Sequence, residues 1–133
     1  MLNGSCLCGR VAYEAEARVE TIAHCHCETC RKAHGAAFSS IASVPRDQVR
    51  WVRGEDLLSA YESSPGKVRR FCSVCGSQLV AERDGAPNVM LRLGCLDTPV
   101  TADRQWHIWR SDGATWYDPS VPHPELAEGF PPA

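Results

Sequence analysis

The turn that decides the fold reads Cys72-Ser73-Val74-Cys75-Gly76, and a shorter counterpart near the start of the chain reads Cys6-Leu7-Cys8-Gly9. A tight turn brings its two sulfurs to roughly 3.8 Å, the separation of two thiolates on one tetrahedral zinc ion. The glycine after each pair supplies a bend that a Cβ would hinder. Two such half-sites, far apart in sequence, predict one closed zinc site, which is structural because it leaves no coordination position for chemistry. Its ligands would be Cys6, Cys8, Cys72 and Cys75. The alternative, that these cysteines pack as small hydrophobic side chains, is disfavoured by their paired spacing.

A second group of cysteines lies in Cys25-His26-Cys27-Glu28-Thr29-Cys30. On an extended segment Cys25 and Cys27 face the same side, and Cys30 can return to them across a helical turn. Three protein ligands leave a fourth position for water, a side chain or a substrate atom, which is the arrangement of catalytic zinc. The alternative is a second closed site, completed by His24, His26 or Cys95. The spacing alone leaves both open.

A disulfide framework is the other use that eight cysteines could have. Disulfides persist in oxidising compartments, and the segment from Met1 to Cys6 lacks the basic and apolar regions of a signal peptide. Cysteines two residues apart would also form a strained disulfide. We therefore expect reduced thiols, metal binding and a cytoplasmic location.

Composition limits the remaining possibilities. The 133 residues are enough for one domain with its own core, and we expect a single zinc-binding domain over residues 1–133. The formal net charge of -2 gives no electrostatic reason to expect nucleic acid or an anionic membrane as a partner. No apolar run approaches the roughly 20 residues that span a bilayer.

Short alternating segments separated by turn residues predict a β-rich, sandwich-like domain. One short helix is expected over Glu28 to His34, and a loosely packed surface strap over residues 119–133. The expected strands cover residues 11–15, 21–24, 38–44, 49–53, 57–61, 68–71, 78–82, 89–93 and 107–109.

Basic residues adjoin each cysteine group: Arg10 near Cys8, Arg31-Lys32 after Cys30, and Arg69-Arg70 before Cys72. They could offset the negative charge of several thiolates around each ion, or they could be ordinary solvated surface residues. Arg31 and Lys32 could instead receive a carboxylate of an anionic thiol substrate.

These motifs together resemble a known family. The segments are Gly4-Ser5-Cys6-Leu7-Cys8-Gly9-Arg10-Val11, Cys25-His26-Cys27-Glu28-Thr29-Cys30-Arg31-Lys32, Phe71-Cys72-Ser73-Val74-Cys75-Gly76, Gly94-Cys95-Leu96-Asp97, and His107-Ile108-Trp109 with Trp116. They are similar to the glutathione-dependent formaldehyde-activating enzyme family, which also includes centromere protein V. The resemblance covers the chain from Gly4 to about Tyr117.

The resemblance implies an all-β, Mss4-like fold of folded antiparallel sheets. It implies two zinc ions per chain: a structural ion on Cys6, Cys8, Cys72 and Cys75, and a catalytic ion on Cys25, Cys27 and Cys30. The implied activity is that of a carbon–sulfur lyase, which adds the thiol of glutathione to formaldehyde to give S-(hydroxymethyl)glutathione. No role for Cys95 follows from it.

Zinc can bind a thiol as its thiolate at neutral pH, or it can polarise an aldehyde oxygen. Three thiolate ligands weaken its Lewis acidity, which favours delivery of the thiol. The alkoxide that forms needs a proton, and His26, His34 and Ser39 are the candidates nearest in sequence.

Two other classes compete with the lyase. One is a non-catalytic zinc scaffold or interaction module of the same fold. The other is a redox enzyme such as a methionine sulfoxide reductase, which the C-x-C spacing of the first pair disfavours. The physiological aldehyde and thiol, and whether the chain forms a homo-oligomer, do not follow from the sequence.

Overall fold

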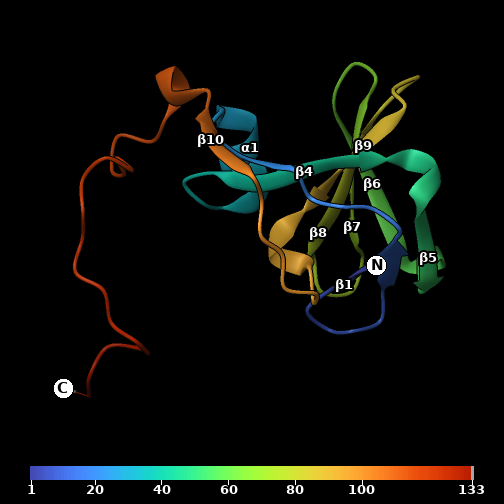
Figure 1. Cartoon of the computed structure of the whole chain (residues 1–133), viewed down its shortest axis with the longest axis horizontal. Coiled ribbons are helices and arrows are strands. Elements are labelled where there is room, and N and C mark those ends of the chain that lie inside the picture. Colours follow the sequence, from blue (N-terminus) through green and yellow to red (C-terminus); the bar gives the residue numbers. More distant parts are fainter. Residues whose placement is uncertain (133) are drawn as a thin grey trace.

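The computed structural model describes residues 1–132, and most of the chain is β structure arranged in two sheets. The larger sheet has seven strands in the order β10-β3-β4-β9-β8-β7-β6, and the smaller has three in the order β1-β2-β5. Figure 1 shows α1 beside β4 and β10, at one end of the larger sheet. The β-rich class and the single short helix predicted from the sequence are confirmed.

The strand bounds follow the alternation of the sequence closely. The ten strands are β1 Leu2–Ser5, β2 Ala12–Ala15, β3 Thr21–Cys25, β4 Ser39–Pro45, β5 Val49–Arg53, β6 Leu58–Ser64, β7 Lys67–Cys72, β8 Gln78–Arg83, β9 Asn88–Arg92 and β10 Arg104–Ile108. The helix α1 covers Glu28–His34, and four single 3-10 turns connect the strands at Arg46–Gln48, Glu55–Leu57, Leu93–Cys95 and Arg110–Asp112.

Two features of the sheets were not expected. Strand β1 pairs antiparallel with β2, although its sequence Leu-Asn-Gly-Ser resembles a turn. Strand β10 pairs with β3 in parallel, from Arg104 opposite Thr21 to Ile108 opposite Cys25. The other strand pairs are antiparallel. The antiparallel pairing expected from the sequence is therefore confirmed, and this edge adds a parallel pair to it.

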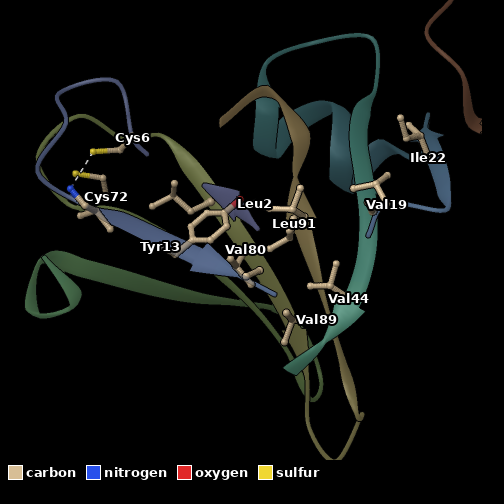
Figure 2. Packing of buried hydrophobic residues seen from close by; sticks show 14 residues of the cluster. Leu2, Cys6, Tyr13, Val19, Ile22, Val44, Cys72, Val80, Val89 and Leu91 are labelled. Atoms are coloured by element: carbon tan, nitrogen blue, oxygen red, sulfur yellow. Dashed lines mark hydrogen bonds between the residues drawn. The ribbon is translucent and has the colours of Figure 1, made fainter. Parts of the chain in front are cut away.

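The hydrophobic core lies between the two sheets. Leu2 and Tyr13 of the smaller sheet pack toward Val80 and Leu91 of the larger one, and all four side chains are buried. Figure 2 shows this packing, with Cys6 and Cys72 at one end of the same core. The core thus continues directly into the first cysteine group.

The segment after Asp118 does not form the expected strap. Figure 1 shows it running away from the two sheets, and residues 120–132 are exposed. Ala133 lies outside the described residues. No described helix combines the length and apolar character needed to traverse a membrane.

Candidate metal centres

The first centre unites two turns that are far apart in the sequence, with Cys72 standing 64 positions after Cys8. The sulfurs of Cys6, Cys8, Cys72 and Cys75 all lie within 4.8 Å of one another. The Sγ atoms of Cys6 and Cys8 are 3.6 Å apart, and those of Cys8 and Cys72 are 3.8 Å apart. These separations match the roughly 3.8 Å edge of a tetrahedral zinc–thiolate site. The four residues fit one metal ion.

Local hydrogen bonds stabilise negative charge on these sulfurs. The backbone N–H of Val11 donates to Cys6 Sγ at 3.3 Å. The Ser77 hydroxyl lies 3.3 Å from Cys75 Sγ, and hydrogen bonding from Ser77 lowers the pKa of the Cys75 thiol to about 5. Gly76 takes the left-handed conformation (φ 78°) that lets the chain turn at this point. The turn therefore favours the thiolate of Cys75, the protonation state that binds metal.

The second centre is built by the end of β3 and the start of α1. Cys25 ends the strand and pairs with Ser39 of β4, so its position is fixed by the sheet. Cys27 is the N-cap residue of α1, and its Sγ accepts a hydrogen bond from the Cys30 N–H at 3.3 Å. The sulfurs of Cys25, Cys27 and Cys30 lie within 4.8 Å of one another. The three cysteines thus converge on one point, as predicted.

The electrostatic surroundings of the three sulfurs differ. Burial raises the pKa of the Cys25 thiol to about 12. Burial also opposes ionisation of Cys30, but the neighbouring Ser39, Cys27 and Arg69 side chains outweigh it and lower the pKa of this thiol to about 7. Arg69 is itself buried, and its Nη2 lies 3.8 Å from Cys30 Sγ. The donor set suits a soft divalent cation such as zinc, because thiolates are the ligands that zinc prefers in such groups.

In the part of the chain that the structure describes, the second centre contains three cysteine ligands and no fourth His, Cys, Asp or Glu ligand. Each of the residues that could have completed a closed site makes a hydrogen bond elsewhere; His26 Nδ1 is buried without a partner, but it is not among the converging ligand atoms. His24 binds Ser40 Oγ and Gln105 Oε1, His26 Nε2 binds His107 Nδ1 at 2.8 Å, and Cys95 Sγ donates to the Gln78 carbonyl oxygen. The structure thus gives the second group no fourth protein donor among residues 1–132.

Several predicted neighbours of the clusters lie elsewhere. Arg69 contacts Cys30 of the second group, although the sequence places it next to Cys72. Arg70 instead pairs with Glu82. Arg31 donates to the carbonyl oxygens of His26 and Asp112, and Lys32 forms an ion pair with Glu28.

Sequence reasoning missed two features of this region. His107, which the sequence linked to no cysteine group, belongs to an aromatic group with His24, His26 and Phe38. Arg92 is buried near the same cysteines and was not singled out. The only sequence signal for Arg92 is a charged residue directly after the buried strand positions Val89 and Leu91.

All eight cysteines are free thiols, so the structure contains no disulfide among residues 1–132. The absence of disulfides agrees with the clustering seen in the sequence. It leaves seven of the eight thiols in the two metal-binding groups and Cys95 outside them.

Comparison with solved structures supports the fold. The chain is similar to a Rhodobacter sphaeroides protein solved as a structural genomics target, with a TM-score of 0.61 and 24% sequence identity. The match covers 78% of this chain and 98% of the other.

Sequence relatives bear the name of one enzyme. A Fusarium vanettenii protein is 31% identical over 62% of this chain and 44% of its own length, and a Podospora anserina protein is 35% identical over 56% and 36%. Both are named as glutathione-dependent formaldehyde-activating enzymes. The matches thus span less than half of these relatives. Residues 1–112, which include both cysteine groups, match the family description "Glutathione-dependent formaldehyde-activating enzyme". The chain belongs to this family.

Proposed function

We propose that the protein is a zinc-dependent carbon–sulfur lyase that adds the thiol of glutathione to formaldehyde or another small aldehyde, giving an S-(hydroxymethyl) adduct. The observation that carries the proposal is the three-cysteine group of Cys25, Cys27 and Cys30, which has no fourth protein donor within residues 1–132. Family membership and the names of the relatives support the same reaction class. The free thiols are consistent with a cytoplasmic location, which we also propose.

In this proposal Cys25, Cys27 and Cys30 hold the ion in place. Zinc held by these three cysteines would supply the positive charge that stabilises an incoming thiol as its thiolate, the nucleophilic form. The Arg69 guanidinium beside Cys30 offsets part of the negative charge of the thiolates. The chain therefore supplies a rigid and partly neutralised ligand set.

The reaction forms one carbon–sulfur bond and moves the thiol proton to the former carbonyl oxygen. Ser39 is placed best to pass that proton, because β-sheet pairing fixes it opposite Cys25 and its hydroxyl lies near Cys30. His26 is a less suitable proton donor, because its Nε2 is already hydrogen-bonded to His107. His34 is neutral near pH 7, because burial and two nearby arginines lower its pKa to about 4.

We assign the other group, Cys6, Cys8, Cys72 and Cys75, to a structural zinc ion. Four thiolates fill a tetrahedral shell and leave no position for a substrate. The group also continues the hydrophobic core through Cys6 and Cys72, which are buried. Binding of this ion would therefore stabilise the fold itself.

The competing class, a non-catalytic zinc scaffold, requires that the second ion be saturated by the chain. His24, His26 and Cys95 were the alternative donors; each makes a hydrogen bond elsewhere, and none is among the converging ligand atoms. These contacts favour the lyase over the scaffold.

Replacement of Cys27 by serine tests the proposal. Serine is a good N-cap residue, so C27S should keep the start of α1 while it removes one soft zinc ligand. We expect the zinc content to fall from two ions per chain to about one and adduct formation, followed by NMR with glutathione and 13C-formaldehyde, to be lost. Unchanged adduct formation above the uncatalysed rate would refute the proposal. Cys95→Ser is the matched control, which should retain both zinc ions and activity.

A further inference from the structure

Arg92, the last residue of β9, is a buried charge with no hydrogen-bond partner among residues 1–132. Its side chain is only 3% exposed, and its Nε, Nη1 and Nη2 atoms make no hydrogen bond to any described residue. A buried cation without partners is costly, so such groups are normally paired or hydrogen-bonded. Arg92 therefore needs a negatively charged or polar group from outside the fold.

The charges around Arg92 act on it in opposite directions, because thiolates at Cys30, Cys25 and Cys27 favour its charged form while Arg69 opposes it. Burial lowers the pKa of the Arg92 guanidinium most strongly, and the positive charge of Arg69, the second buried arginine, lowers it further, to about 10. The guanidinium therefore remains protonated at neutral pH. Three thiolates and one Zn²⁺ would leave a single negative charge at the second centre. Arg69, with its Nη2 3.8 Å from Cys30 Sγ, lies against that charge. Neither arginine has a carboxylate partner among residues 1–132.

Arg92 lines a cavity of about 440 Å³ between α1 and the turn of the first cysteine group. This volume lies in the range that binds small molecules. The wall includes small residues that leave room, namely Ala33, Ala36, Gly76 and Gly94. Two further wall atoms, His34 Nε2 and Gln78 Oε1, are buried and have no hydrogen-bond partner in the described chain. The cavity is thus lined by buried polar groups whose hydrogen-bonding capacity a ligand could satisfy.

The cavity adjoins the second centre. Ser39, which lies near Cys30, forms part of its wall, and His34 follows Cys30 by one turn of α1. A molecule bound to Arg92 in this cavity would therefore extend toward the three-cysteine group.

We propose that this cavity receives a carboxylate of the thiol substrate, with Arg92 as its charged partner and His34 beside it. A guanidinium binds a carboxylate through two parallel N–H···O bonds, a geometry that fixes orientation as well as charge. This inference rests on the proposed function, because it takes the bound carboxylate to belong to the molecule whose sulfur reaches the second centre. It assigns the carboxylate to Arg92 in place of Arg31 and Lys32, whose charged groups already have partners.

Calorimetric binding to the zinc-loaded protein tests the inference with three probes. Glutathione carries a thiol and two carboxylates, glutathione diethyl ester keeps the thiol and loses both carboxylates, and S-methylglutathione keeps the carboxylates and blocks the thiol. We expect glutathione to bind at least about tenfold more tightly than the diester. In Arg92→Gln this preference should vanish, and in Arg92→Lys it should be weakened but not lost, because lysine keeps the charge without the paired hydrogen bonds. Lys32→Gln, on the exposed face of α1, is the matched control and should keep it.

The outcomes separate this inference from the proposed function. If glutathione and its diester bind equally well to the wild-type protein, or if Lys32→Gln abolishes the preference as Arg92→Gln should, the carboxylate assignment is wrong while the lyase proposal stands. If S-methylglutathione binds as tightly as glutathione and in an Arg92-dependent manner, the cavity is as proposed and the thiol–zinc step fails. Loss of S-methylglutathione binding in Arg92→Gln, with an unchanged melting temperature, supports the inference, because a merely structural arginine would lower the melting temperature.

Discussion

At the scale of single residues, the two cysteine groups differ in what each sulfur contributes. Cys72 is fully buried where β7 ends, and it belongs both to the core and to the four-thiolate group. Cys27 is partly exposed and caps α1. In the proposed function, the first group would act mainly on stability and the second mainly on chemistry.

Cys72→Ser should destabilise the protein by about 3 kcal/mol or more, because structural zinc binding is part of the folding free energy. We expect one zinc ion per chain to be lost and thermal unfolding to occur at a much lower temperature. Cys95→Ser is the control, since Cys95 lies outside both groups and serine can keep the hydrogen bond to the Gln78 carbonyl oxygen. A Cys72→Ser protein as stable as the Cys95→Ser protein would contradict the structural role of the first group.

His34 should make folding stability depend on pH. Burial and the nearby Arg92 and Arg69 lower its pKa from 6.5 to about 4 in the folded protein. The folded state therefore binds fewer protons than the unfolded state between these values, and the stability present above pH 6.5 is lost as the pH falls toward 4.

Comparison of the wild type with His34→Gln isolates this effect from acid-induced loss of metal. Urea unfolding at several pH values between 7 and 4 should show a steeper decline for the wild type. Identical declines in the two proteins would show that His34 does not titrate with a lowered pKa.

At the scale of the elements, the turn between β5 and β6 depends on Gly54. This residue has a left-handed backbone (φ 72°), and a Cβ added there would lie 2.1 Å from the Arg10 carbonyl oxygen. Gly9 has a similar backbone (φ 79°), but a Cβ there would meet nothing within 4 Å. The two glycines thus separate the effect of backbone strain from that of crowding.

Gly54→Ala should cost more stability than Gly9→Ala. Gly9→Ala should lose about 1 kcal/mol from the left-handed backbone alone, and Gly54→Ala about 2–4 kcal/mol, because overpacking against Arg10 is added. Chemical denaturation of the two variants checks the order. An equal loss would mean that the chain around Arg10 moves away at little cost.

The sequence was informative about elements wherever a local signal existed. The helix Glu28–His34 and the strand Val49–Arg53 have the predicted bounds. Strand β1 could not be predicted, because Asn3 and Gly4 favour turns and only pairing with β2 makes the segment extended. The early residues of β10 are likewise extended by their parallel pairing with β3.

At the scale of the whole molecule, the last residues leave the body of the protein. Residues 122–132 are exposed, and Figure 1 shows them away from both sheets. Ending the chain after Val121 should change the free energy of unfolding by less than about 0.5 kcal/mol. A larger loss in thermal unfolding would show that the tail packs on the body in solution.

The candidate site was predictable to the extent that its residues are close in sequence. Cys25, Cys27 and Cys30 are positioned by one strand end and one helical turn, so their spacing was sufficient. Arg92 was not predictable, because only the sheet order, with β9 beside β4, brings it to the cavity next to α1. Arg69 was assigned to the wrong group for the same reason.

The central claim is that the second zinc ion has a coordination position that a substrate sulfur can fill. X-ray absorption at the zinc edge measures the average number of sulfur neighbours per ion. With two ions per chain we expect about 3.5 sulfurs per zinc, rising to about 4 when glutathione is added. An average of four sulfurs before the addition, no change after it, or a single zinc ion per chain would contradict the claim.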